Sequence, residues 1–78
     1  MELARALNDV ASRLRDIISK AREKGYTNER FFEHIVRARV ELLTAIEYMF
    51  AYGKLDPETY SKIMREQIEE PLKKILGQ

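Results

Sequence analysis

Residues 29–52 are the stretch of the chain that most restricts its fold. Their sequence, ERFFEHIVRARVELLTAIEYMFAY, contains no glycine or proline and carries large apolar side chains in nearly every turn. At about 100° per residue, these side chains cover roughly half of a helix circumference, which is wider than the apolar stripe of an ordinary surface helix. The stretch therefore predicts one long helix at the centre of an all-α fold.

Two further segments have the apolar spacing of helices. Residues 2–24 repeat apolar side chains at alternating intervals of four and three, which is a heptad pattern with one apolar face. Residues 57–76 carry an apolar stripe that contains Gln67 and is interrupted by Pro71, and proline disfavours a helix interior. We predict helices over about 2–24, 28–52 and 57–76, with a kink or break near Pro71.

The connections between these helices are short and carry helix-end signals. Gly25 and Gly53 occupy positions where a left-handed residue closes a helix. Thr27 is predicted to cap the amino end of the second helix, and Asp56, followed by Pro57, to cap the third. Because such short connections make consecutive helices antiparallel, the predicted fold is a three-helix up-down-up bundle.

The second helix offers more apolar surface than two neighbouring helices can cover. Residues 1–78 form one small domain, and a chain of this size buries only about two-thirds of its unfolded surface. Disulfides cannot supplement the core because the sequence has no cysteine. We therefore expect association into a larger helical bundle, with a homodimer as the first choice and a higher even oligomer as the second. The alternative is a monomeric three-helix bundle with a deeply buried middle helix.

The composition argues against several classes of protein. Fourteen Lys and Arg against thirteen Asp and Glu leave almost no net charge to attract nucleic acid or an anionic membrane. A single histidine and the lack of cysteine argue against a metal site. The sequence has no glycine-rich phosphate-binding loop that would indicate a cofactor. No apolar run is long enough to span a bilayer. We expect a cytoplasmic protein without cofactors, and its abundant helix formers and short loops favour thermostability.

Arg39 lies near the middle of the apolar arc of the second helix. A buried guanidinium needs acidic or carbonyl partners, and the candidates are Glu47 or an acidic residue of a facing helix or a second chain. Such a pair would fix the register of an oligomer, or the arginine would bind an anion in a groove. Alternatively, its stem covers apolar surface while its head reaches solvent. Arg39 with Gln67 would also be the nucleus of a pocket in an all-helical enzyme, although no catalytic residue is assigned.

The residues expected at an oligomer or partner interface all lie on the second helix. They are Phe32, Ile35, Arg39, Leu42, Ile46, Tyr48, Met49 and Tyr52. Tyr48 and Tyr52 lie on a flank away from the main apolar arc, and tyrosine is favoured at interfaces because its ring is apolar and its hydroxyl polar. They would either contact a partner protein or pack against Tyr60 or the first helix of the same chain.

The first helix carries the basic residues that would contact nucleic acid. They are Arg13, Arg15, Lys20, Arg22 and Lys24. Arg15 and Arg22 share one side of the helix and the other three share another, with acidic residues between them. Phosphate binding needs a continuous positive stripe. A solvated face is therefore the simpler interpretation, unless two copies combine their first helices.

We predict a non-enzymatic oligomerisation or protein-interaction module, such as a small adaptor or regulatory bundle. The alternative function is a small nucleic-acid-binding protein that presents the basic face of the first helix from an oligomer. A third is an all-helical enzyme with a pocket around Arg39. The arrangement of the helices bears on all three, because it shows which apolar and charged side chains stay exposed.

Overall fold

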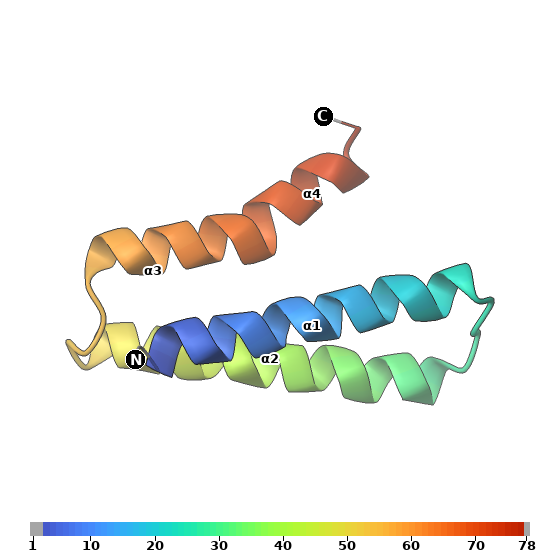
Figure 1. Ribbon diagram of the computed structural model, residues 1–78, viewed down its shortest axis with the longest axis horizontal. Coiled ribbons are helices and arrows are strands. Elements are labelled where there is room, and N and C mark those ends of the chain that lie inside the picture. The colour runs from blue at the N-terminus through green and yellow to red at the C-terminus, as the bar shows by residue number, and fades with distance from the viewer. Residues whose placement is uncertain (1–2, 78) are drawn as a thin grey trace.

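The protein is an all-α bundle with the predicted up-down-up order. The computed structural model describes residues 3–77, and for residues 74 and 75 the backbone alone. Its α-helices in this range are α1 (Leu3–Glu23), α2 (Glu29–Ala51), α3 (Pro57–Met64) and α4 (Glu70–Ile75). A π-helical segment, η1 (Arg65–Glu69), joins α3 to α4. In Figure 1, α1 and α2 lie antiparallel side by side, and α3 runs back in the direction of α1, which confirms the fold class.

The helix ends follow the local signals of the sequence in most places. Gly25 and Gly53 have φ angles of 85° and 75°, a left-handed conformation that glycine adopts without a steric penalty. Asp56 caps α3, because its carboxylate accepts a hydrogen bond from the backbone N–H of Thr59 at 2.9 Å. Pro57 occupies the first turn of α3, where its missing N–H costs no helical hydrogen bond.

The N-cap of α2 is Asn28 rather than the predicted Thr27. The side-chain oxygen of Asn28 accepts a hydrogen bond from the backbone N–H of Phe31 at 3.1 Å. Asparagine ranks above threonine at this position, so the prediction chose the weaker of two neighbouring capping residues. The other bounds agree with the prediction to within one residue. Residue 2, where the first helix was predicted to begin, lies outside the described residues.

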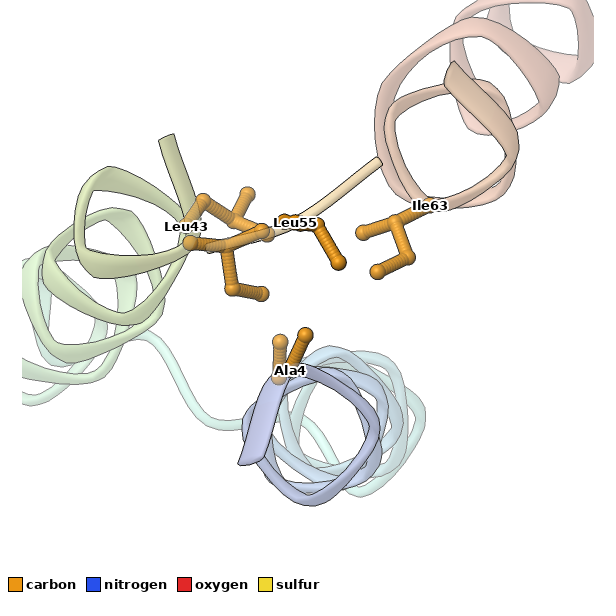
Figure 2. Packing of buried hydrophobic residues seen from close by; sticks show 6 residues of the cluster. Ala4, Leu43, Leu55 and Ile63 are labelled. Carbon is orange, nitrogen blue, oxygen red and sulfur yellow. The ribbon is translucent and has the colours of Figure 1, made fainter. Parts of the chain in front are cut away.

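The core lies where α1, α2 and α3 converge. Its buried members are Ala4, Ala11, Leu43, Ile46, Leu55 and Ile63. Figure 2 shows Ala4 of α1, Leu43 of α2 and Ile63 of α3 pointing toward one another, with Leu55 between them. Beside this cluster, the rings of Phe50 and Tyr60 stack with centroids 4.3 Å apart. This buried cluster comes from α1, α2, α3 and the connection between α2 and α3, whereas none of the described side chains of α4 is buried.

The third helical rod, which consists of α3, η1 and α4, is interrupted before Pro71 as predicted, but the interruption is longer than expected. The break was expected near Pro71, at Glu69 and Glu70, but the π-helical segment already begins at Arg65. Proline removes a hydrogen bond to the residue four positions before it, so its effect appears in the preceding turn. After the break, α4 tilts away from the α1–α2 hairpin (Figure 1). Among residues 3–77, no helix is long and apolar enough to cross a membrane.

Candidate functional site

Gln67 is the centre of a polar network where the three helical rods meet. It belongs to η1, and only 2% of its surface is exposed. Its Nε2 donates hydrogen bonds to Asn8 Oδ1 at 2.7 Å and to Ser12 Oγ at 2.8 Å, both on α1. Its Oε1 accepts a hydrogen bond from Arg39 Nη2 on α2 at 3.0 Å. Because a buried amide needs such partners, this single side chain joins all three rods.

Arg39 also donates a hydrogen bond to the backbone carbonyl of Gln67. In a regular α-helix the N–H of residue 71 would donate to this carbonyl, but Pro71 has no N–H. Arg39 therefore replaces the donor that the proline removes. Arg39, Gln67 and Pro71 each break the pattern of an idealised bundle when considered alone, and in the structure they form one unit.

Arg15 has the same role at the preceding carbonyl. Its Nη1 donates a hydrogen bond to the backbone carbonyl of Glu66 at 3.2 Å. The N–H of Glu70 would donate to that carbonyl in an α-helix, but it donates to the carbonyl of Arg65. The π-helical segment thus turns two successive carbonyls toward the hairpin. One arginine from α1 and one from α2 bind them.

The two arginines place positive charge next to the network, and both are half-buried. Burial, and then the positive charge of Arg15, lower the pKa of Arg39, which nevertheless stays protonated because arginine has a very high pKa. Its hydrogen bonds go to neutral oxygen atoms of Gln67. Within residues 3–77 its buried Nε has no hydrogen-bond partner. Glu47, a candidate partner from the sequence, is exposed.

An open cleft of about 950 Å³ adjoins the network, between α1 and the η1–α4 segment. Three arginines line it: Arg15, Arg22 and Arg39. Its apolar lining comes from Ile18, Ile68, Pro71 and Leu72, and its carboxylates from Asp9, Asp16, Glu66 and Glu70. The four carboxylates are exposed, whereas Arg15 is half-buried and the guanidinium of Arg39 reaches into the network. Arg15 and Arg39 are therefore less exposed than the four carboxylates, whereas Arg22 is exposed as they are.

The residues predicted for an interface differ in how far they are buried within their own chain. Ile46 is fully buried in the core of its own chain, and Arg39 is bound to Gln67. The half-buried ones include Phe32, Ile35, Leu42 and Met49. Tyr48 and Tyr52 are exposed, and their rings stack on each other with centroids 6.1 Å apart. They therefore do not pack against Tyr60, whose ring stacks on Phe50 instead.

The basic residues predicted for nucleic acid fall into two groups. Arg15 and Arg22 line the cleft, and the guanidinium carbon of Arg22 lies 5.5 Å from the ring centroid of Phe32, within cation–π range. The remaining three are exposed residues of α1 and the turn after it, namely Arg13, Lys20 and Lys24. The five side chains therefore do not form one continuous surface.

Sequence reasoning missed the partners that α1 contributes to the network. Asn8 and Ser12 are spaced by four residues, so they lie on one side of the helix next to its apolar stripe. That spacing is a usable signal for a buried polar contact. The bond from Arg15 to the Glu66 carbonyl has no such signal, because the acceptor is a backbone atom that any residue type carries.

Residues 3–77 contain no group of three or more His, Cys, Asp or Glu side chains placed to hold a metal ion. The chain matches no protein-family model, no curated protein and no solved structure.

Proposed function

We propose that this protein is a homodimeric interaction module, in which a second copy covers the face of the α1–α2 hairpin opposite α3. The observation that carries the proposal is the accessible surface area of 6245 Å². A compact monomer of 9.2 kDa exposes about 4,900 Å². The excess of about 1,300 Å² is larger than the area of about 800 Å² that one partner contributes to a standard interface.

The overall dimensions agree with this excess. The radius of gyration is 13.6 Å, whereas a compact domain of this length has about 11.5 Å. The principal extents are 41, 28 and 19 Å, so the chain is a thin slab rather than a sphere. In such a thin molecule each helix buries only the side chains on its inner side. A second copy packed against an outer side of the hairpin would complete the bundle.

On α1, the apolar residues left exposed form one row. Leu3, Val10 and Ile17 are spaced by seven residues and are 67%, 44% and 43% exposed. Ser12 marks the side of α1 that faces η1, because it bonds to Gln67. The row lies about 140–180° around the helix from Ser12. It therefore lies on the side away from the third rod.

On α2, the two stacked tyrosines occupy the corresponding side. Arg39 marks the side that faces η1, and Tyr48 and Tyr52 lie about 140–180° around α2 from it. We call these two tyrosines, together with the α1 row, the open hairpin face. A two-fold dimer that pairs two such faces is a four-helix bundle with α1 and α2 of each copy at its centre.

The nucleic-acid alternative has no comparable support, because the five basic residues are divided between the cleft and the outer side of α1. The open hairpin face also differs from the set of residues predicted from sequence. Only Tyr48 and Tyr52 belong to both.

Two matched variants test the dimer. Ile17→Glu places a charge on the open hairpin face, and Val36→Glu places one on the other flank of α2 at a residue with the same exposed fraction, 43%. Light scattering on a sizing column is expected to give twice 9.2 kDa for the wild type and for Val36→Glu. Ile17→Glu is expected to elute as a folded monomer, because a buried unpaired carboxylate is costly.

Two outcomes would contradict the proposal. A monomeric wild type at millimolar concentration would exclude a dimer of functional strength. Dissociation by Val36→Glu but not by Ile17→Glu would place the interface on the opposite side of the hairpin. Circular dichroism of each variant separates dissociation from unfolding.

A further inference from the structure

The cleft between α1 and η1–α4 is lined by two arginines whose guanidinium groups are bound to neutral acceptors. Arg15 donates to the carbonyl of Glu66, and Arg39 to the carbonyl and side chain of Gln67. Each guanidinium carries five N–H groups, so these bonds leave donors for a further acceptor. Two cations that line the same cleft both attract an anion, and the partial burial of Arg39 reduces the screening of its charge by water.

One wall of the cleft is apolar and exposed. Ile68 and Leu72 are 48% and 51% exposed although they continue the inward-facing stripe of the third rod. They stay uncovered because α4 tilts away from the hairpin after η1 (Figure 1). Together with Ile18 on the opposite wall, they offer a surface for an aliphatic or aromatic group next to the arginines.

The carboxylates that line the cleft restrict the charge of the ligand. The exposed residues Asp9, Asp16, Glu66 and Glu70 line the same cleft as the arginines. They would repel a polyanion such as a nucleic acid, whose charges extend beyond the two arginines. A ligand with one negative charge and an apolar remainder can place its charge on the two arginines and keep the rest of the molecule uncharged.

We propose that this cleft binds a small monocarboxylate with an apolar body, its carboxylate on Arg15 and Arg39 and its body against Ile18, Ile68 and Leu72. The volume of about 950 Å³ lies within the usual range for small-molecule sites. The site is separate from the open hairpin face, so it goes beyond the proposed dimer and does not depend on it.

Titration of the full, ¹⁵N-labelled chain with sodium hexanoate tests the site by NMR. Saturable shifts are expected in the amides of residues 15–18 and 66–72. The neutral analogue 1-hexanol and equal concentrations of sodium chloride are the ligand controls. If 1-hexanol shifts the same amides with equal affinity, the cleft is an apolar groove and the carboxylate site is overturned.

Matched arginine variants test the head-group contact. Arg15→Gln is expected to weaken hexanoate binding about tenfold, the loss of one charge-assisted hydrogen bond. Arg13→Gln changes an exposed arginine on the other side of α1, outside the cleft, and is expected to leave the affinity unchanged. Equal affinities for wild type and Arg15→Gln would overturn the proposal, as would the absence of saturable shifts.

Repeating the titration with Ile17→Glu separates this site from the dimer. Hexanoate binding by that variant is expected to match the wild type, whatever the oligomeric state. If binding is lost only when the dimer dissociates, the carboxylate lies at the interface between copies, and the cleft assignment is overturned while the dimer stands.

Discussion

At the scale of single residues, Arg39 shows how a charged side chain is accommodated in an apolar arc. It lies among the core side chains of α2, yet its guanidinium finds two acceptors on Gln67. One of these, the backbone carbonyl, has lost its helical donor because Pro71 has no N–H. The guanidinium of Arg39 and the carbonyl of Gln67 therefore each supply the hydrogen-bond partner that the other lacks.

Arg39→Met is expected to destabilise the protein by about 2 kcal/mol, because Gln67 keeps a buried amide oxygen and carbonyl without their donor. Urea unfolding followed by circular dichroism measures the loss. Arg37→Met, at an exposed position of the same helix, is expected to change the stability by no more than about 0.5 kcal/mol. A gain in stability for Arg39→Met would show that the network is costly rather than stabilising.

Asn28→Ala tests the N-cap of α2. The variant removes the acceptor for the Phe31 N–H, so the free energy of unfolding is expected to fall by about 1 kcal/mol and the melting temperature by about 4–8 °C. Thr27→Ala is the control, since Thr27 lies one residue outside the cap. A larger loss of unfolding free energy for Thr27→Ala than for Asn28→Ala would show that Thr27 is the N-cap, as predicted from sequence.

Asp56 gives the fold a pH-dependent contribution. Hydrogen bonds from Thr59, first from its backbone N–H and then from its side chain, lower the pKa of Asp56. Folding therefore favours the carboxylate. The stabilisation is fully present above the ordinary pKa of aspartate and is lost as the pH falls through the lowered value.

Melting temperatures of wild type and Asp56→Asn, measured from neutral to acidic pH, test this contribution. The advantage of the wild type is expected to be greatest at neutral pH, where the carboxylate also interacts with the amino end of α3. It is expected to shrink as the carboxyl group becomes protonated. A difference that stays constant over the whole range would rule out the charge as its cause.

At the scale of elements, both the sequence of the third rod and its contacts with the hairpin contribute to the break in that rod. Proline removes one donor, and a straight helix with a single missing bond is one way to accommodate it. Here the segment instead shifts to π-helical pairing over Arg65–Glu69, where Arg15 and Arg39 bind two of its carbonyls. After this segment α4 tilts away from the hairpin, and the cleft lies between α1 and the η1–α4 segment.

A double-mutant cycle tests this coupling. In Pro71→Ala the N–H of residue 71 can donate to the Gln67 carbonyl, so Arg39→Met is expected to cost less in that background than in the wild type. A coupling free energy of about 1 kcal/mol or more is expected for residues that share an acceptor. Strictly additive effects in urea unfolding would show that the proline and the arginine act independently.

At the scale of the whole molecule, the chain has a small core and a large exposed apolar surface. Its buried cluster lies between the hairpin and α3, while rows of apolar side chains remain exposed on α1, on α2 and along the η1–α4 segment. Pairing of two open hairpin faces would bury the α1 row and the tyrosines. Each fully buried large side chain adds about 1.5–3 kcal/mol.

If folding and dimerisation are linked, the melting temperature of the wild type rises with protein concentration. Differential scanning calorimetry over a hundredfold range of concentration measures this. Ile17→Glu is expected to remove the dependence, whereas Val36→Glu is expected to retain it. A concentration-independent wild type would argue against a dimer linked to folding.

Much of the architecture could be predicted from sequence because its signals are local. The apolar spacing of residues 29–52, the glycines at positions 25 and 53 and the Asp56–Pro57 pair determine helices and turns within a few residues of themselves. The N-cap of α2 was assigned to the wrong residue because Thr27 and Asn28 are adjacent and both can accept the same kind of bond.

The candidate site depended on contacts between residues far apart in the chain. Sequence reasoning identified Arg39, Gln67 and Pro71 as departures from the helical pattern and required carbonyl or acidic partners for a buried arginine. It paired Arg39 with Gln67 only as the nucleus of a possible enzyme pocket. Only the tertiary structure showed that Arg39 lies against Gln67, 28 positions away, and that Arg15 binds a backbone carbonyl of the same segment. Helix formation depends on neighbours along the chain, whereas the pairing of these groups depends on how the rods cross, which local pattern does not specify.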